Sequence, residues 1–442
     1  MRITPLESWI SQKIANGSEP LSREKIAAYQ LMKLRDTLRR AKERSPFYAR
    51  RLAGFDENAI SGLEDLSRLP FTTPDHVRRD DSGFLCVSQS EVSRVVTLQT
   101  SGTTGEPKRL YFSADDQELT VDFMHRGMST FVGPGDRVLI MLPGGRPGGV
   151  AALLAAALGR LGAVGLAHGP VSDLSSTLEL VAREKITSLV GAPVEILSLA
   201  RRAGAGAAPR SVLLTTDHVP EAITAELRRL WGCDVYNHYG MTEMGLGGGV
   251  ECGAHHGYHL READLYFEIV DPKTGAPAGE GERGEIVFTT LTRRAMPLIR
   301  YRTGDLSRFL PEPCPCSTVL KTLERVRDRI EGNLALGASG TLGMADLDEA
   351  LFPLSGLLDF SASILREKER DRLNIEIHAM EGCVEQAVRQ ARTAVEAIPA
   401  VRSALAEDAL FLSVYPRREG GTGPITTGKR RIGDRGRETP RL

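Results

Sequence analysis

Residues 100–108 read TSGTTGEPK, a run in which hydroxyl side chains and glycines precede an acid, a proline and Lys108. Glycines let main-chain N–H groups approach an anion closely, and the hydroxyls and the lysine add donors and positive charge. The run is not a Walker A loop, because its second glycine comes too early for that motif. The composition predicts either another kind of phosphate-binding loop or a surface turn rich in Ser, Thr and Gly.

Two further segments carry carboxylates in turn-like settings. HYGMTEMG, residues 238–245, comes at the end of the apolar run CDVYN and contains Glu243, whereas YRTGDL, residues 301–306, contains Asp305. A carboxylate near a triphosphate would suit Mg²⁺, which takes hard oxygen ligands and uses few protein ligands beside phosphate oxygens. Each segment also has an ordinary interpretation. The first can be a strand–loop junction with an incidental acid. The second can be a β-turn.

In register over its whole length, TSGTTGEPK resembles the Thr-Ser-Gly-Thr-Thr-Gly-x-Pro-Lys loop of the adenylate-forming enzymes. This superfamily contains acyl-CoA synthetases, peptide-synthetase adenylation domains and luciferases. The resemblance implies that the loop and its lysine bind the phosphates of ATP. The residues assigned to this role are Thr100, Ser101, Gly102, Thr103, Thr104, Gly105 and Lys108.

The segment HYGMTEMG resembles the Tyr-Gly-x-Thr-Glu motif of the same superfamily. The resemblance implies that Tyr239 lies by the adenine, that Thr242 meets the α-phosphate and that Glu243 helps to hold magnesium. Gly240 and Met241, which lie between them, are assigned to the same nucleotide site.

Later segments resemble the ribose-binding and hinge motifs of the superfamily. YRTGDL is similar to its Tyr/Arg-x-Thr-Gly-Asp motif, which implies that Asp305 contacts the ribose hydroxyls. LERVRDRI occupies the place of the Gly-Arg-x-Asp-Asp hinge, where Arg325 matches the ribose-contacting arginine. Glu324 replaces the hinge glycine and Arg327 replaces the usual hinge aspartate, so the hinge departs from the family pattern.

The segment ITTGKRRIGD near the C-terminus would, in isolation, be interpreted as a basic and mobile end of the chain. Adenylate-forming enzymes carry a lysine in a Gly-Lys context near the C-terminus that enters the active site when the small domain closes. Lys429 matches that lysine, although ITT departs from the residues often found before it.

Four cysteine and histidine residues predict a metal site. Cys252 and His259 in ECGAHHGYHL have a C-x6-H spacing, and Cys314 and Cys316 form C-P-C. Three thiolates and one imidazole would give a closed tetrahedral zinc site of the structural kind. The alternative is that these are ordinary loop residues, because C-x-C is tighter than the usual C-x-x-C. Some phenylacetate-CoA ligase-like proteins are similar here, and their Gly-x-His favours His259 over His256.

The composition is ordinary for a globular protein of 442 residues, a length that predicts two or more domains. The 56 basic and 57 acidic residues nearly balance, which argues against a dedicated nucleic-acid binder. The N-terminal MRITPLESWISQK has no apolar signal-peptide region, and the most apolar run, residues 150–167, fits a helix and a strand better than a bilayer span. We therefore expect a cytoplasmic protein that makes no contact with membranes.

The positions of these motifs predict an α/β fold. Short apolar runs that end in turn residues recur at residues 137–144, 163–169, 186–193 and 211–217, each followed by a helix-like segment. Such alternation indicates a parallel sheet with covered faces, which binds ligands beyond the carboxyl ends of its strands. After Tyr258, strands follow one another without helices and predict an antiparallel or barrel-like part.

We predict a large N-terminal adenylation domain, residues 1–323, with parallel α/β sheet layers and a β-barrel-like part. A small, mobile α+β C-terminal domain, residues 324–442, would carry Lys429. SPFYARRL and FTTPDHVRRD resemble segments of the phenylacetate-CoA ligase-like group, which includes coenzyme F390 synthetase.

This resemblance implies an AMP-forming acid–thiol ligase that uses ATP, Mg²⁺ and CoA. A carboxylic acid, expected to be an aryl or arylacetic one, would attack the α-phosphorus of ATP, and the thiol of CoA would then displace AMP. The residues leave other acceptors open, namely an amine, a phosphate-bearing cofactor or a carrier-protein thiol. They also leave open a nucleotide-binding relative without activity. Dimers occur among the resembled ligases, so a homodimer is a further expectation.

Overall fold

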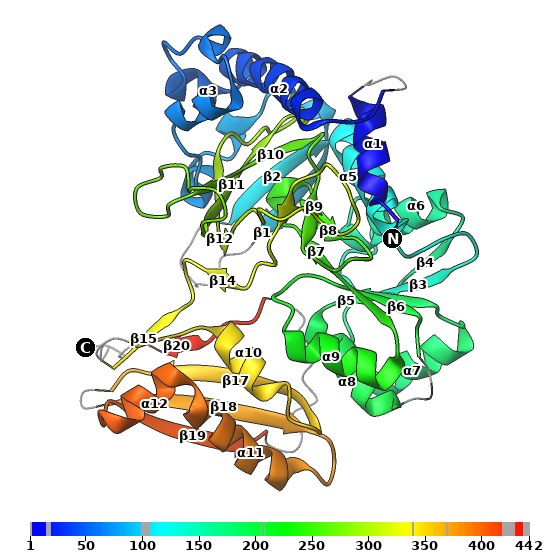
Figure 1. Ribbon diagram of the computed structural model, residues 1–442, viewed down its shortest axis with the longest axis vertical. Coiled ribbons are helices and arrows are strands. Elements are labelled where there is room, and N and C mark those ends of the chain that lie inside the picture. The colour runs from blue at the N-terminus through cyan, green and yellow to red at the C-terminus, as the bar shows by residue number, and fades with distance from the viewer. Residues whose placement is uncertain are drawn as a thin grey trace. The chain divides into compact units, whose positions relative to one another are not determined.

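The computed structural model describes residues 2–14, 19–98, 107–204, 206, 208–337, 340–367, 370–417 and 429–435 (Figure 1). The chain forms two compact units, which we call the first and the second unit. The first comprises Met1–Asp136, Gly144–Gly165 and Tyr236–Val326, and the second comprises Arg137–Pro143, Leu166–Val235 and Arg327–Leu442. The division into domains 1–323 and 324–442 remains a prediction.

The first unit holds the helices near the N-terminus and most of the antiparallel strands. Its helices are α1 (Pro5–Lys13), α2 (Arg23–Arg44), α3 (Pro46–Arg51), α4 (Pro74–Arg79), α5 (Ala114–Met128) and α6 (Val150–Arg160). Its strands are β1 (Val92–Leu98), β2 (Lys108–Ser113), β8 (Gly249–Glu251), β9 (Tyr258–Leu260), β10 (Leu265–Val270), β11 (Gly284–Thr290), β12 (Tyr301–Ser307) and β13 (Thr322–Leu323). The chain passes between the units within β4 (Val164–Ala167) and β7 (Asp234–Tyr239).

Antiparallel pairing dominates this unit. Strands β10, β11 and β12 form a meander in which Leu265 pairs with Thr290 and Gly284 pairs with Ser307. Strands β7, β8, β9 and β13 also pair antiparallel in that order. The prediction of successive strands without helices after Tyr258 is confirmed, and Asp305 lies on one of these strands, β12.

Local capping fixes where α5 begins. The hydroxyl of Ser113 accepts a hydrogen bond from the main-chain N–H of Asp116 at 3.2 Å, and the Asp116 carboxylate accepts one from the N–H of Ser113 at 3.0 Å. Such a reciprocal cap satisfies two N–H groups that a helix N-terminus leaves unpaired. It therefore joins the end of β2, which begins at Lys108, rigidly to α5.

The second unit contains the remaining parallel strands and the C-terminal α+β region. Its helices are α7 (Leu174–Arg183), α8 (Pro193–Ala203), α9 (Glu221–Trp231), α10 (Met344–Leu351), α11 (Val384–Ala397) and α12 (Pro399–Ala406). Its strands are β3 (Arg137–Ile140), β5 (Ser188–Gly191), β6 (Ser211–Leu214), β14 (Asp328–Arg329), β15 (Leu334–Leu336), β16 (Gly340–Leu342), β17 (Leu357–Leu365), β18 (Asp371–Ala379), β19 (Leu410–Pro416) and β20 (Gly433–Arg435).

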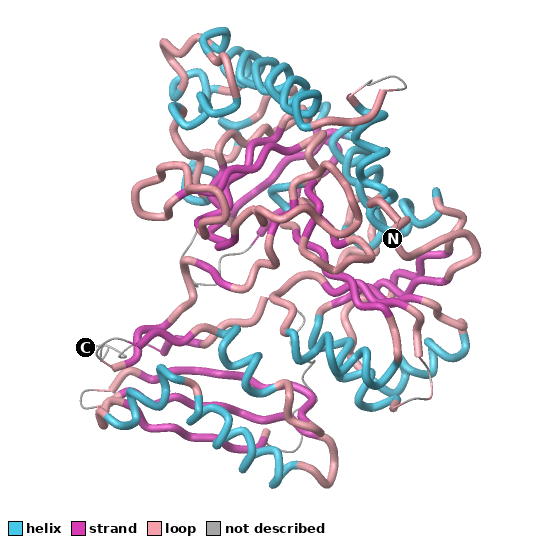
Figure 2. The backbone as a smooth tube through the Cα atoms, in the orientation of Figure 1, coloured by secondary structure: helices cyan, strands magenta, loops and turns pink. Residues whose placement is uncertain are grey.

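Two sheets organise the second unit. Strands β3, β5 and β6 are parallel and buried, as the short apolar runs predict, with Val138 opposite Ser188 and Leu189 opposite Val212. The C-terminal sheet has the order β19-β18-β17-β20, and α11 and α12 lie against one of its faces (Figure 2). Residues 433–435 of the basic tail thus belong to a sheet, because β20 pairs parallel with β17.

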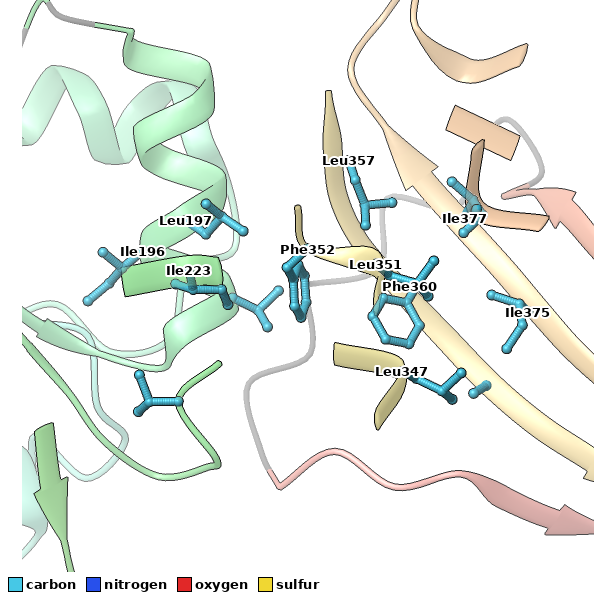
Figure 3. Close-up of a cluster of buried hydrophobic side chains, with 14 of the residues drawn as sticks. Ile196, Leu197, Ile223, Leu347, Leu351, Phe352, Leu357, Phe360, Ile375 and Ile377 are labelled. Atoms are coloured by element: carbon cyan, nitrogen blue, oxygen red, sulfur yellow. The ribbon is translucent and has the colours of Figure 1, made fainter. Parts of the chain in front are cut away.

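An apolar core joins these parts of the second unit. In Figure 3, Leu197 on α8 and Ile223 face Phe352, beyond which Leu351 and Phe360 continue the cluster. All five side chains are at most 2% exposed. Among the helices of the described residues, none is long and apolar enough to cross a bilayer.

Candidate active site

The predicted phosphate loop is held at both ends by a β-hairpin. Leu98 at the end of β1 pairs with Lys108 at the start of β2. Residues 99–106 lie outside the described part of the chain. The predictions for Thr100, Ser101, Gly102, Thr103, Thr104 and Gly105 therefore concern residues that the structure does not describe.

Lys108 lies beside two residues from distant parts of the first unit. Its ammonium group forms an ion pair with the carboxylate of Glu243 and lies 3.1 Å from the hydroxyl of Tyr301. That hydroxyl also donates a hydrogen bond of 3.2 Å to the Glu243 carboxylate. The hairpin, the loop after β7 and strand β12 thus meet at one carboxylate.

The environment of Glu243 favours its ionised form. The residue is 5% exposed, and burial by itself raises the pKa of the carboxyl. The charge of Lys108 and the hydrogen bonds from Lys108 and Tyr301 outweigh this effect, so the pKa of Glu243 lies below its ordinary value. A buried carboxylate that stays charged at neutral pH suits a divalent cation.

A tight turn positions Glu243 and Thr242. The 3-10 helix η5 (Thr242–Met244) follows β7 and ends at Gly245, whose φ of 73° is a left-handed conformation. Gly240 packs so closely that a Cβ there would lie 2.5 Å from the carbonyl oxygen of Leu246. Only glycine fits such an approach without a shift of the main chain.

Tyr239 and Asp305 contact each other directly. The Tyr239 hydroxyl donates a hydrogen bond of 3.0 Å to the Asp305 carboxylate, and both residues are more than nine-tenths buried. They come from β7 and β12, and Tyr258 on β9 packs 5.9 Å from the Tyr239 ring. The structure therefore brings together the residues predicted to meet the adenine and the ribose.

Arg325 is held by a partner that the sequence motifs did not indicate. Its Nε donates to the carboxylate of Glu251 at 2.6 Å. Glu251 is fully buried, and its other oxygen accepts a hydrogen bond from the N–H of Asn237 at 3.0 Å. Burial raises the pKa of Tyr258, the charges of Glu251 and Asp305 raise it further, and the charge of Arg325 lowers it.

The atypical hinge residues have structural partners. Glu324 pairs with Arg308 at 2.9 Å in the first unit, and Arg327 pairs with Asp346 at 3.0 Å in the second. One boundary between the compact units falls between Val326 and Arg327. The predicted pivot near this position remains a prediction.

Lys429 belongs to the second unit, where it is exposed. The next residue, Arg430, is buried and forms an ion pair with Asp348. The main-chain N–H of Arg430 also donates a hydrogen bond of 2.8 Å to the carboxylate of Asp217. The chain on the C-terminal side of Lys429 is thus firmly anchored.

The predicted metal ligands form one buried cluster in the first unit. The ligand atoms of Cys252, His259, Cys314 and Cys316 all lie within 4.8 Å of one another. The Sγ atoms of Cys252 and Cys314 are 3.7 Å apart, and the Sγ of Cys316 is 3.5 Å from Nε2 of His259. All six cysteines of the chain are free thiols, so no disulfide competes for this set.

The chemistry of this cluster fits a tetrahedral cation. Burial raises the pKa of the Cys252 and Cys314 thiols. Burial has the same effect on Cys316, but the hydrogen bond from His259 and main-chain hydrogen bonds lower its pKa to about 6. Three sulfur atoms and one imidazole nitrogen at these separations match the donor set of structural zinc sites.

Comparison with known proteins identifies the family of this chain. The family model described as AMP-binding enzyme matches residues 74–291. The phenylacetate-coenzyme A ligase of Thermus thermophilus is 34% identical over 67% of this chain and 69% of its own length. The phenylacetate-coenzyme A ligase of Escherichia coli is 31% identical over 71% of this chain and 72% of its own length.

Solved structures show the same fold. A 2-hydroxyisobutyryl-CoA ligase in the postadenylation state, in complex with 2-HIB-AMP, aligns with a TM-score of 0.78 at 20% identity. The alignment covers 94% of this chain and 91% of that chain. An anthranilate CoA ligase in complex with anthranoyl-AMP aligns with a TM-score of 0.51 at 16% identity, over 74% of this chain and 65% of that one. The predicted fold class is confirmed. The chain therefore belongs to the adenylate-forming AMP-binding enzymes, in the phenylacetate-CoA ligase branch of the AMP-forming acyl-CoA ligases.

Proposed function

We propose that this enzyme joins an aryl or arylacetic acid to CoA, with ATP converted to AMP and pyrophosphate. The observation that carries the proposal is the convergence of Lys108, Glu243 and Tyr301 in the unit that also pairs Tyr239 with Asp305. A charged carboxylate suits Mg²⁺ beside phosphate oxygens, and a lysine supplies positive charge for the phosphates.

We assign the nucleotide contacts as follows. Residues 100–105 and Lys108 clasp the β- and γ-phosphates, Tyr239 lies against the adenine with Gly240 and Met241, and Asp305 and Arg325 hold the ribose hydroxyls. Support for Arg325 comes from its ion pair with the buried Glu251, which limits the directions in which the guanidinium can point. Support for Asp305 comes from its burial and its hydrogen bond with Tyr239.

Glu243 is assigned as the magnesium ligand. When bound, Mg²⁺ would neutralise phosphate charge as pyrophosphate departs. Lys108 pairs with Glu243, and we infer that Lys108 turns to the phosphates when the nucleotide binds. The hydroxyl of Thr242 would then donate a hydrogen bond to an oxygen of the α-phosphate.

The proposed reaction has two steps. A carboxylate oxygen attacks the α-phosphorus of ATP, the bond to the bridging oxygen of pyrophosphate breaks, and an acyl-adenylate forms. The CoA thiolate then attacks the acyl carbon and AMP leaves with the oxygen that bridged carbon and phosphorus. Lys429 would stand between the carboxylate and the α-phosphate in the first step, where it offsets the repulsion of two anions.

The acid is proposed from the relatives, which are named for phenylacetate. The segment 142–165, LPGGRPGGVAALLAAALGRLGAVG, is rich in small and apolar residues and is compatible with the wall of an aromatic pocket. ATP–pyrophosphate exchange with a panel of acids tests the assignment. Exchange with benzoate- and phenylacetate-type acids, followed by thioester formation with CoA, is expected. Exchange with dicarboxylic or short aliphatic acids alone would overturn the choice of acid, and product formation with amines but not CoA would overturn the acceptor.

The four-residue cluster is proposed as a structural zinc site. Cys252 follows β8, His259 lies on β9, and Cys314 and Cys316 precede β13, so a shared ion would tie the start of the β-rich part to its end. A cytoplasmic location and a homodimer are retained as predictions. Cell fractionation and light scattering, respectively, would test them.

A further inference from the structure

A buried arginine lies directly behind the turn that carries Thr242 and Glu243. Arg293, in the connection between β11 and β12, is 5% exposed. Its Nη1 donates a hydrogen bond of 2.8 Å to the carbonyl oxygen of Glu243, and its Nη2 lies 3.5 Å from that of Thr242. The guanidinium carbon lies 4.5 Å from the centre of the Phe112 ring. Arg293 thus touches the main chain of both residues.

Arg293 is unusual because its charge is not used in an ion pair. Among the described residues no carboxylate lies within ion-pair distance of its guanidinium, whereas its neighbour Arg294 pairs with Asp115 at 2.6 Å near the surface. Burial of a cation is costly unless its donors are satisfied by strong acceptors. The acceptors of Arg293 are the two carbonyl groups of the Thr242–Glu243 turn, so the cost of burial is compensated at that turn.

The segment around Arg293 is itself fixed. The Asp116 carboxylate accepts hydrogen bonds from the N–H groups of Arg294 at 2.7 Å and of Ala295 at 3.0 Å. Asp116 also caps α5, so the helix and the Arg293 segment are held as one piece. The direction of the Arg293 side chain is therefore determined by a rigid support.

The far side of the same turn is equally constrained. The Thr120 hydroxyl donates a hydrogen bond of 3.0 Å to the carbonyl oxygen of Gly245. A Cβ on Gly245 would lie 3.3 Å from that hydroxyl and 3.8 Å from Nη2 of Arg293. A cavity of about 20 Å³ between these groups is large enough for one water molecule. Loss of the guanidinium would thus open a polar space behind the turn.

We propose that Arg293 is a positioning residue of the nucleotide site, which fixes the main chain of Thr242 and Glu243 and keeps a positive charge behind the turn that receives the α-phosphate and magnesium. This inference rests on the proposed roles of Thr242 and Glu243. Burial lowers the pKa of Arg293 to about 10, and the nearby carboxylates of Asp116 and Glu243 limit the decrease. The guanidinium is therefore charged at neutral pH.

Three variants test the role. Arg293→Met keeps the length of the side chain and removes all donors. Arg293→Lys keeps the charge and enough reach for one carbonyl. Arg294→Met is the matched control, because it removes the adjacent exposed arginine. For each variant, calorimetry measures the affinity for Mg-ATP, exchange kinetics measure kcat and KM for ATP, and thermal unfolding measures the folded fraction.

The expected results distinguish positioning from folding. Displacement of catalytic groups by about 1 Å can cost on the order of 10²-fold in rate, and we expect such a loss in kcat for Arg293→Met with Mg-ATP affinity about tenfold weaker. The kcat of Arg293→Lys should be about tenfold higher than that of Arg293→Met. The kcat of Arg294→Met should stay within about twofold of the wild-type value. These effects should persist at temperatures where every variant is fully folded.

Two results would overturn this inference, and a third would overturn the proposed function. Wild-type kcat and Mg-ATP affinity in folded Arg293→Met would overturn the inference, as would a loss that Arg293→Lys does not reduce. If the wild type supports no acid-dependent exchange, the proposed function fails instead. The affinity of Arg293→Met for Mg-ATP then still decides whether this arginine positions the turn.

Discussion

Lys108 and Glu243, which are 135 positions apart in the sequence, form an ion pair inside the first unit. The carboxylate is 7% and the lysine side chain 12% exposed, so the pair is shielded from water. Tyr301 donates to the same carboxylate and limits its rotation. The pair joins the lysine at the end of the phosphate-loop motif to the acid assigned to magnesium.

Substitution Lys108→Met should make the activity sensitive to pH. Lys108 is what keeps the pKa of Glu243 below its ordinary value, so without it burial dominates and the pKa rises. In the wild type the ionised form is lost only as the pH falls through the lowered pKa, whereas in the variant it is lost at higher pH. We expect exchange at pH 7 to fall on the order of 10²-fold and the acidic limb of the pH–rate profile to move upward.

The matched control for this substitution is Arg109→Met. Arg109 is the next residue on β2, half-exposed, and lies 3.4 Å from Asp81 on the outside of the hairpin. Its loss should leave the pH profile unchanged. An unaltered acidic limb in Lys108→Met would show that the lysine does not set the charge of Glu243.

Lys429→Ala should separate the two half-reactions. Adenylation needs the lysine between two anions, so acid-dependent exchange should fall on the order of 10²- to 10³-fold. Thioester formation from preformed acyl-AMP should change little. Arg431→Ala, which removes another exposed cation of the same tail, is the control. Equal losses in both half-reactions would reject the assigned role.

Arg430→Met should destabilise the second unit in a pH-dependent way. The guanidinium of Arg430 pairs with Asp348 and lies 4.2 Å from the Phe360 ring, beside the apolar cluster of Figure 3. Removal of one partner from a buried ion pair costs about 3–5 kcal/mol. Urea unfolding monitored by circular dichroism measures the loss.

The pH dependence follows from Asp348. Burial raises its pKa to about 6, Arg430 lowers that pKa, and Asp217 and His218 also act on it. Without Arg430 the pKa rises further, so Asp348 is protonated and neutral at pH 5 but must ionise without a partner as the pH increases. The stability deficit of the variant should be larger at pH 7.5 than at pH 5. Equal deficits at both pH values would contradict this interpretation of the buried pair.

Cys314→Ser should release the proposed zinc and lower stability. We expect about one zinc ion per chain in the wild type and much less in the variant, measured by plasma mass spectrometry. The melting temperature should fall by more than about 5 °C, which corresponds to about 5 kcal/mol at an unfolding entropy of about 2.1 cal/mol/K per residue. His256→Gln and Cys383→Ser, which change residues outside the cluster, should keep both the metal and the melting temperature. A metal-free wild type with unchanged stability in Cys314→Ser would exclude a structural ion.

Patterns along the chain predicted much of the fold. The short apolar runs at residues 137–144, 163–169, 186–193 and 211–217 contain β3, β4, β5 and β6. The reason for β3, β5 and β6 is that buried parallel strands need apolar residues on both faces, whereas β4 is partly exposed. The strands after Tyr258 also lie where their pattern indicates. Helix α1, in contrast, is too short for the spacing of its apolar residues to predict a helix.

The sequence did not predict which side chains the site residues contact. Motif residues such as Tyr239 and Asp305 were identifiable because local spacing carries the motif. Arg293 and Arg294 are adjacent and chemically identical, and only long-range packing makes one buried and the other exposed. Glu251 likewise resembles a surface acid until Arg325, which is 74 positions away, pairs with it.

The most direct test of acyl-adenylate chemistry follows the oxygen atoms of the acid. With a carboxylate substrate labelled with oxygen-18, turnover in the presence of ATP and CoA should yield AMP that carries one labelled oxygen, since the bridging oxygen leaves with AMP when the thiol attacks carbon. Mass spectrometry of AMP measures this transfer. AMP without label, or label found in inorganic phosphate, would show that the acid is never joined to the α-phosphate and would contradict the proposed mechanism.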